Sequence, residues 1–217
     1  MKTKIKVLGV GSGAIKIINR LVEAGAENNF TVVDCEKYEL ERSKAAQVIK
    51  IGESITRGLR TGGDILLGKR IARVYEKELK ALASGADVFL LISLLGGGIS
   101  SSVTAEVARH IKEQNKNAVV IAILTQPMRL EGHIKTYCTE ISLRDIKPYV
   151  DTRVLFDMRD VSPNTPRNAD LKYMMGFADD ALVGYLLKLI PKLPSITRDN
   201  LKSIIPDGTQ EKYFKTI

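Results

Sequence analysis

Glycine-rich runs that directly follow apolar segments are the part of this sequence best suited to bind an anion. Gly96, Gly97 and Gly98 follow an apolar run that ends at Leu95, and a hydroxyl cluster at residues 100–102 comes just behind them, at the start of a helical pattern. Because glycine has no Cβ, several backbone amides can approach one anion, and the N-terminus of a helix adds unpaired N–H groups and a positive dipole end. We therefore predict a phosphate-binding turn at this point.

Two more glycine-rich segments fit the same purpose. Residues 9–13 join the first apolar run to a helical pattern, and residues 58–64 could close over the same ligand. A glycine turn alone can serve packing equally well, but turns at the ends of neighbouring parallel strands converge on the edge where open α/β sheets bind ligands. The dinucleotide fingerprint is incomplete because Lys16 stands where its third glycine belongs, although Asp34 could still bind a ribose. A mononucleotide is therefore the favoured ligand, and a dehydrogenase is the weaker alternative.

The apolar patterns predict the elements that position these turns. Strand-length runs at residues 5–10, 30–33, 88–94, 118–124 and 153–156 alternate with helical patterns at residues 14–24, 66–83, 101–114, 132–146 and 174–190. This alternation is typical of an α/β fold, and the wholly apolar runs at 88–94 and 118–124 are expected in its centre. We predict a three-layer Rossmann-like domain over residues 1–190, with a mainly parallel sheet and a long central helix after the last core strand. A loop at 162–168 precedes that helix, and residues 191–217 are expected to form a short helix at 198–205 and a polar tail.

Composition narrows the classes of function. The 217 residues carry a formal net charge of +8, but Lys and Arg are scattered and aromatic residues are few, so an anionic partner is favoured while nucleic acid is disfavoured without being excluded. With two cysteines, two histidines and no CxxC pair, neither a disulfide nor a metal site is expected. The sequence shows no transmembrane segment or secretory signal, so we expect a cytoplasmic protein.

Several motifs in order resemble the GTP-binding domain of the FtsZ and tubulin family. Residues 51–64 are similar, without a gap, to the FtsZ segment IGSGITKGLGAGAN. Residues 126–132 resemble the family's KPFxFEG, and Val150, Asp151 and Thr152 precede the next strand as they do in the family. The resemblance runs from about Lys4 to Ile190 and implies that GTP or GDP is bound, with Mg²⁺ bridging the phosphates.

The resemblance also implies a set of site residues. The phosphate loops of the family match three segments: Gly11, Ser12 and Gly13 match the first loop, Gly62 and Gly63 match the loop that senses the terminal phosphate, and the signature GGGTGTG matches Gly96, Gly97, Gly98, Ile99, Ser100 and Ser101. Around the base and the ribose, Asn19 matches a guanine contact, Glu131 matches a ribose contact, and Lys135 matches an arginine near the nucleotide. Asp34 and Cys35 match an Asn-Thr pair after the second strand, and Asp179 and Asp180 match an Asn-Asp pair at the head of the central helix. A carboxylate there can accept hydrogen bonds from N1–H and the N2 amine of guanine, an edge that adenine lacks.

Each of these residues also has a purely structural interpretation. Acidic residues such as Asp179 and Asp180 are favoured near a helix N-terminus by the dipole alone, and serines cap helices well. Asn19 and Lys135 could be solvated surface residues, and Glu131 could merely adjoin a helix cap. The order and spacing of the whole set, more than any one residue, support the nucleotide site.

Departures from the family pattern bear on catalysis. The acidic residues that activate water in FtsZ align with Thr197 and Asn200, with Asp199 adjacent, and Met158 falls near the position of a guanine-binding asparagine. We therefore predict a guanine-nucleotide-binding protein with weak or absent hydrolysis, linked to cytoskeletal or cell-division assembly. The alternatives are a GTPase activated by assembly, through self-association or an FtsZ/tubulin-like partner, and a nucleotide-free scaffold that retains the fold.

Overall fold

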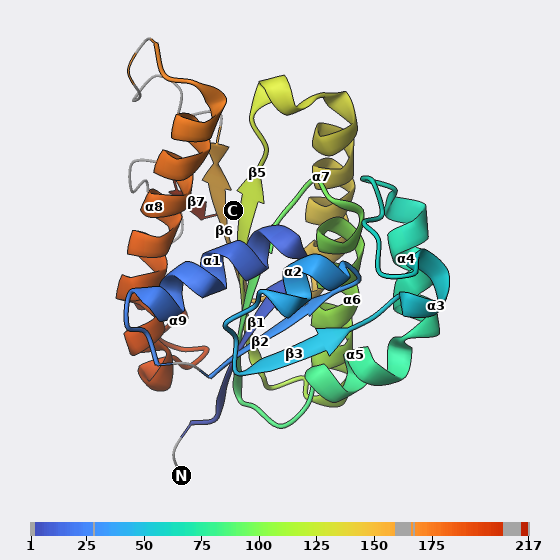
Figure 1. Cartoon of the computed structure of the whole chain (residues 1–217). Coiled ribbons are helices and arrows are strands. Elements are labelled where there is room, and N and C mark those ends of the chain that lie inside the picture. Colours follow the sequence, from blue (N-terminus) through green and yellow to red (C-terminus); the bar gives the residue numbers. More distant parts are fainter. Residues whose placement is uncertain (1–2, 28, 159–165, 167, 206–213, 217) are drawn as a thin grey trace.

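A single twisted sheet forms the centre of the molecule (Figure 1). The computed structural model describes residues 3–27, 29–158, 166, 168–205 and 214–216. Within these ranges the sheet has the order β3-β2-β1-β4-β5-β6-β7. Neighbouring strands pair in parallel except β6 and β7, which are antiparallel. The strands are β1 (Ile5–Val10), β2 (Phe30–Asp34), β3 (Gln47–Lys50), β4 (Val88–Leu94), β5 (Val119–Gln126), β6 (Thr152–Asp157) and β7 (Phe214–Thr216).

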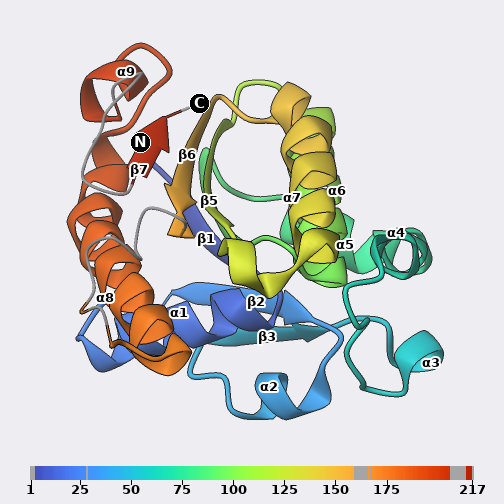
Figure 2. The same cartoon turned by 90° about the horizontal axis from the view of Figure 1, so that it is seen from above.

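Helices cover both faces of the sheet and give the predicted three layers (Figure 2). The long helix α8 lies beside α1 on one face, while α4, α5, α6 and α7 lie on the other. The helices are α1 (Ser12–Glu23), α2 (Lys37–Glu41), α3 (Glu53–Thr56), α4 (Ile65–Val74), α5 (Glu76–Leu82), α6 (Gly98–Gln114), α7 (His133–Ile146), α8 (Leu171–Leu189) and α9 (Leu201–Ile204), with short 3₁₀ helices at Arg129–Glu131, Lys147–Tyr149 and Ile190–Ser195. The Rossmann-like α/β fold with a long helix after the last parallel strand is therefore confirmed.

The apolar runs of the central strands divide between two cores because successive side chains of a strand point to opposite faces. Leu90 packs in the cluster that contains α1 and α8, whereas Leu91 packs in the cluster that contains α4, α5 and α6. Both side chains are completely buried. Burial on both faces explains why these segments are apolar throughout, as parallel strands covered by helices must be.

Three elements differ from the sequence prediction. Strand β3 was not predicted, since it is short and mostly exposed and carries polar residues. The single helix predicted at 66–83 is two helices, because the backbone of Tyr75 leaves the helical region (φ −104°, ψ 27°) between α4 and α5. The predicted polar tail contains β7, which adds to the sheet beside β6. The loop predicted at 162–168 lies outside the described residues except for positions 166 and 168.

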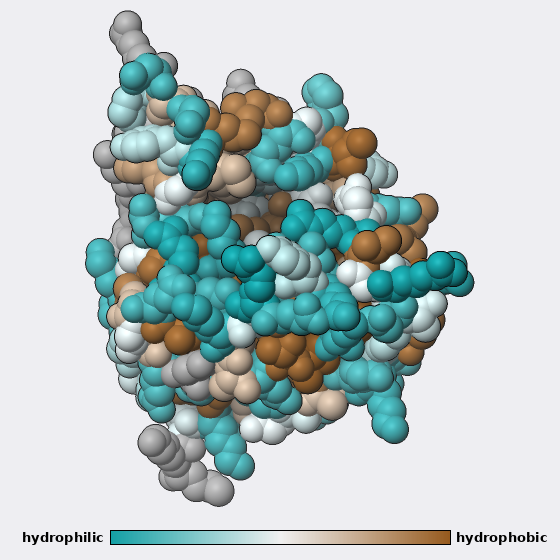
Figure 3. Space-filling model, viewed as in Figure 1, coloured by the Kyte–Doolittle hydropathy of each residue, from teal (hydrophilic) through white to brown (hydrophobic). Residues whose placement is uncertain are grey.

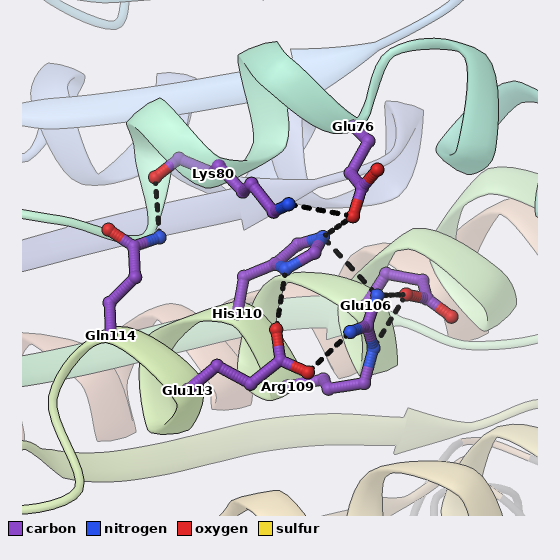
Figure 4. Close-up of polar contacts among 7 residues, drawn as sticks. All are labelled: Glu76, Lys80, Glu106, Arg109, His110, Glu113 and Gln114. Atoms are coloured by element: carbon purple, nitrogen blue, oxygen red, sulfur yellow. Dashed lines mark hydrogen bonds and ion pairs between the residues drawn. The ribbon is translucent and has the colours of Figure 1, made fainter.

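Charged side chains join α5 to α6 on the outer layer (Figure 4). His110 is 1% exposed, and its Nδ1 lies 3.1 Å from Oε2 of Glu113 while its Nε2 lies 4.0 Å from Oε1 of Glu76. Nε2 of Gln114 donates to the carbonyl oxygen of Lys80 at 2.9 Å. His110 therefore links α5 to α6 through its two ring nitrogens.

The described residues contain no group of three or more metal-ligating side chains.

Candidate nucleotide-binding site

A cleft of about 620 Å³ opens at the carboxyl ends of the parallel strands. Figure 3 shows the surface hollowed between α8 and the side of the molecule that carries α7. Most of the predicted site residues line it: Gly11, Ser12, Gly13, Asp34, Cys35, Gly62, Gly63, Gly96, Gly97, Gly98, Ile99, Ser100, Glu131, Lys135 and Asp179. The tertiary fold thus brings the three glycine-rich segments together, although they are separated by tens of residues in the sequence.

The glycine turns pack against one another at one end of the cleft. A Cβ on Gly11, whose φ is +87°, would lie 3.0 Å from Cβ of Ser100, so the first turn touches the first turn of α6. A Cβ on Gly98 would lie 2.4 Å from both the carbonyl oxygen of Asp64 and Oγ1 of Thr61. Only glycine therefore allows these backbones to approach so closely, as the sequence motif predicts.

Helix α6 begins at this end of the cleft and supplies backbone donors. The amides of Gly98, Ile99 and Ser100 belong to its first turn, where a helix offers no intrahelical acceptor. The amide of Gly97 donates to Oγ of Ser100 at 3.2 Å, and that of Gly96 donates to Oγ of Ser101 at 3.0 Å. The serines therefore stiffen the turn before the helix and leave the donors of the first helical turn for an anion.

An acidic network lies beside the first glycine turn. The hydroxyl of Ser12 donates to Oδ2 of Asp34 at 2.5 Å and also lies 3.0 Å from Oε2 of Glu36. Burial raises the pKa of Asp34, although the hydrogen bond from Ser12 opposes this shift. Arg60 spans Glu36 and Glu39, with Nε donating at 2.6 Å and Nη2 at 3.1 Å, so the loop at residues 58–64 is tied to this network by a cation.

Cys35, which follows Asp34, is a buried structural thiol. Its Sγ donates to the carbonyl oxygen of Leu59 at 3.3 Å. Burial, with the charge of Asp34 as the next cause, raises the pKa of Cys35 to about 12, so the side chain stays a thiol at neutral pH. Since the thiolate is the reactive form of cysteine, this arrangement suits packing at the cleft wall and not nucleophilic chemistry.

Asp179 on α8 also lines the cleft. It is 5% exposed, and Nζ of Lys16 on α1 contacts its Oδ2 while Nη1 of Arg20 lies 3.7 Å from the same oxygen. Two cations of α1 therefore hold this buried carboxylate in the cleft wall. Met158 and Met175 also line the cleft. A buried carboxylate and two thioethers suit a flat ligand with N–H donors along one edge.

Three of the predicted residues do not line the cleft. Asn19 donates through Nδ2 to the carbonyl oxygen of Arg42 and accepts from the amide of Lys44, so it fixes the chain before β3. Asp180 is exposed and pairs with Arg20, and Ser101 lies buried beneath the turn that it caps. Glu131, in contrast, lines the cleft. Its carboxylate accepts hydrogen bonds from the amide of Met128 at 2.8 Å and from Nζ of Lys135 at 2.7 Å.

Sequence reasoning missed three charged residues of the cleft wall, Lys16, Glu39 and Arg60. Lys16 was noted only as a departure from the dinucleotide fingerprint, and Arg60 only as part of a glycine-rich stretch. Their partners, Asp179 on α8 and the pair Glu36 and Glu39 near β2, are distant in the sequence. The i, i+4 spacing of Lys16 and Arg20 on one helix face was the available signal for the first of them.

The residues that align with the catalytic acids of FtsZ lie at the other edge of the sheet. Thr197 and Asn200 precede α9, and their neighbours Arg198 and Leu201 line a separate small pocket with Asp151 and Thr152, where β6 begins. The cleft lies where the strands end. Within one molecule these residues therefore cannot reach a ligand in the cleft.

A parallel sheet with packed glycine turns at its carboxyl edge, and a buried carboxylate that lines the same cleft, is typical of a nucleotide-binding α/β domain. The cleft suits a nucleotide, since Gly98, Ile99 and Ser100 of the first turn of α6 line it together with the buried Asp179. The Tubulin/FtsZ family, GTPase domain, matches residues 4–161, and the chain belongs to this family.

Individual relatives agree with this assignment. The cell division protein FtsZ 1 of Methanocaldococcus jannaschii is 31% identical over 210 residues, which are 94% of this chain and 54% of the relative. An empty FtsZ dimer from M. jannaschii superposes with a TM-score of 0.85 at 27% identity, over 96% of this chain and 62% of the other. A GTPγS-bound protofilament of CetZ2 from Haloferax volcanii shares the fold at 18% identity, with a TM-score of 0.78 over 94% and 63% of the two chains. The chain thus spans little more than half the length of the FtsZ relative.

Among the helices of the described ranges, none combines the length and apolarity that crossing a membrane requires.

Proposed function

We propose that this chain binds GTP or GDP in the cleft and hydrolyses GTP slowly or not at all by itself. The observation that carries the proposal is that one cleft is lined both by the glycine-rich segments with the first turn of α6 and by the buried carboxylate of Asp179. A nucleotide offers anionic phosphates to the first and, when its base is guanine, N–H donors to the second. Family membership and a relative bound to GTPγS support the same ligand class.

The phosphate end works through backbone donors. Gly98, Ile99 and Ser100 offer first-turn amides, and the positive end of the α6 dipole favours an anion there. The acidic side chains beside the first turn would repel phosphates, but Arg60 partly neutralises Glu36 and Glu39. Mg²⁺ would bridge the phosphates of the bound nucleotide, where it neutralises charge.

Asp179 and Asp180 give a matched test of the base end. Asp179→Ala removes the buried carboxylate, and we expect calorimetry to show GTP affinity lowered at least tenfold, because a hydrogen bond to a charged group contributes about 1.5–3 kcal/mol. Asp180→Ala removes a neighbouring carboxylate that is exposed outside the cleft, and it should leave affinity unchanged. Binding of neither GTP nor GDP by the wild type would contradict the proposal and favour the nucleotide-free scaffold.

Weak hydrolysis follows from the distance between the cleft and the opposite sheet edge. Neither Thr197 nor Asn200 is a carboxylate, and both lie at the edge away from the cleft. Asp199 is exposed at that same edge, so it favours a second candidate, a GTPase completed when the edge of one molecule meets the cleft of another. Phosphate release per molecule would then rise with protein concentration, whereas a flat rate near zero would reject this candidate.

Assembly is part of the same proposal. The relatives are a cell division protein, a dimer and a protofilament, which supports self-association or an FtsZ/tubulin-like partner and a cytoskeletal or cell-division role in the cytoplasm. Sedimentation with GTP, with GDP and without nucleotide tests assembly, and cell fractionation tests the location. Sedimentation that is identical in all three conditions, with no added partner, would contradict nucleotide-dependent self-association.

A further inference from the structure

Arg60 is a cation of the cleft wall that the family pattern does not contain. It lies in the loop at residues 58–64, and the FtsZ segment that resembles residues 51–64 has glycine at the aligned position. The next residue, Thr61, packs against the start of α6, since its Oγ1 would lie 2.4 Å from a Cβ on Gly98. The backbone that carries Arg60 therefore lies beside the helix terminus that offers donors to an anion.

Two carboxylates hold the guanidinium of Arg60 by one edge. Nε donates to Oε2 of Glu36 at 2.6 Å, and Nη2 donates to Oε1 of Glu39 at 3.1 Å. The same Oε2 of Glu36 lies 3.0 Å from Oγ of Ser12 in the first glycine turn. Only one carboxylate oxygen thus separates the guanidinium from that turn, so Arg60 is held close to a second of the glycine-rich segments.

The other edge of the guanidinium is open. Within the part of the chain that the structure describes, Nη1 makes no hydrogen bond, and the side chain of Arg60 is 65% exposed. Lys16 and Lys135, which also line the cleft, each pair with a carboxylate through a single ammonium group. Arg60 differs from them because a guanidinium that is fixed by one edge still presents a planar fork at the other. Such a fork matches two oxygens of a phosphate group.

Given the proposed guanine-nucleotide function, on which this step rests, we infer that Arg60 contacts the phosphate chain of the nucleotide through Nη1 and the outer N–H of Nη2. Glu36 and Glu39 hold the guanidinium in place for this contact. Arg60 then adds a full positive charge to the backbone donors of α6, and it offsets the repulsion between the phosphates and the carboxylate of Asp34, which also lines the cleft.

A purely structural Arg60 would do no more than tie its loop to Glu36 and Glu39. Nucleotide binding should then weaken to the same extent whichever member of the ion pairs is changed. A guanidinium that contacts phosphate must itself be present, whereas its carboxylate partners can be neutralised at a smaller cost. Neutralising them also removes negative charge from the surroundings of the phosphates, which favours binding. The two roles therefore predict different orders of affinity.

The experiment measures GTP affinity by calorimetry in the presence of Mg²⁺. Arg60→Ala should lower the affinity about tenfold, as expected for the loss of a charge-assisted contact. The double variant Glu36→Gln, Glu39→Gln breaks both ion pairs but keeps the guanidinium, and its loss should be about threefold or smaller. Arg57→Ala is the matched control: Arg57 is also exposed, lies three residues earlier outside the cleft wall, and changes the net charge equally. It should leave the affinity unchanged.

Inorganic tripolyphosphate separates a contact with phosphate from an effect on the base. It should compete with GTP for the wild type, and its inhibition constant should rise about tenfold in Arg60→Ala but not in Arg57→Ala. Equal losses of GTP affinity in Arg60→Ala and the double variant would overturn the inference, and so would an absence of competition in the wild type or an unchanged inhibition constant in Arg60→Ala. Each of these results leaves guanine-nucleotide binding standing, whereas failure of the wild type to bind GTP or GDP would overturn the proposed function as well.

Discussion

Thr197 and Asn200 satisfy each other's backbone groups. The amide of Thr197 donates to Oδ1 of Asn200 at 2.7 Å, and the amide of Asn200 donates to Oγ1 of Thr197 at 3.3 Å. Nδ2 of Asn200 also donates to the carbonyl oxygen of Ser195 at 2.7 Å. The two side chains that align with catalytic acids in FtsZ therefore stabilise the turn before α9, which is a structural role.

Removing one member of this pair should lower stability without affecting phosphate release. We expect Asn200→Ala to reduce the free energy of unfolding by about 1–2 kcal/mol, because it removes the two hydrogen bonds between the Asn200 side chain and the backbone of Thr197 and Ser195. Urea unfolding measures the change. Asp199→Ala, at an exposed neighbour, should change stability by less than about 0.5 kcal/mol. A loss of GTP hydrolysis in Asn200→Ala, in a protein that remains folded, would contradict this structural role.

Asp34→Asn should increase stability at neutral pH. Burial raises the pKa of Asp34 in the folded state, so the fold binds this proton more tightly than the unfolded chain does. The stability of the fold therefore falls as pH rises from the pKa of Asp34 in the unfolded chain, about 3.9, through its higher pKa in the folded state. This loss of stability persists at all higher pH values, including pH 7. The neutral amide avoids this cost, and Oδ1 can still accept from the amide of Cys35, which lies 2.6 Å from the carboxylate.

Urea unfolding of the wild type and Asp34→Asn at several pH values between 4 and 8 tests this prediction. The free energy of unfolding of Asp34→Asn, relative to that of the wild type, should increase as pH rises. A wild type that is the more stable protein at pH 7 would show that the ionised carboxylate, held by Ser12 at 2.5 Å, is favourable in the fold.

Gly98→Ala should weaken both the fold and the proposed nucleotide site. Its Cβ would meet the carbonyl oxygen of Asp64 and Oγ1 of Thr61 at 2.4 Å, so the loop at residues 61–64 must move away from α6. We expect a loss of about 1–3 kcal/mol, seen as a lower melting temperature. Gly184→Ala on α8 is the control, because nothing lies within 4 Å of its Cβ and alanine should stabilise the helix by about 0.5–1 kcal/mol. An unchanged melting temperature in Gly98→Ala would contradict the close packing of these turns.

Glu113→Gln should reduce the pH dependence of the free energy of unfolding at acidic pH. The hydrogen bond from Nη1 of Arg109, at 2.5 Å, is the main cause that lowers the pKa of Glu113 (Figure 4). A carboxyl with a lowered folded pKa contributes stability above its unfolded pKa, about 4.3, and loses it as pH falls through the folded value. The difference between wild type and variant should therefore shrink between pH 7 and pH 3, as measured by urea midpoints.

Local pattern was enough to predict much of the fold. The apolar runs gave β1, β2, β4, β5 and β6 because wholly apolar segments of that length are buried on both faces of a parallel sheet. The sequence did not predict strand β3, because it carries polar residues and is mostly exposed. It did not predict β7 either, because only three residues pair with β6. The break at Tyr75 also carries no proline or glycine that would mark it in the sequence.

By itself, the sequence determined the family, the glycine turns and the edge of the sheet at which they meet, because glycine position and strand period are local properties of the chain. Only the tertiary structure decided which charged groups share the cleft. Lys16 meets Asp179 because α1 packs beside α8, and Thr61 meets Gly98 because α4 and α6 approach closely. Asn19, by contrast, turns toward Arg42 and away from the cleft. Such contacts depend on how helices far apart in the sequence cross one sheet, and no spacing within a single element encodes that arrangement.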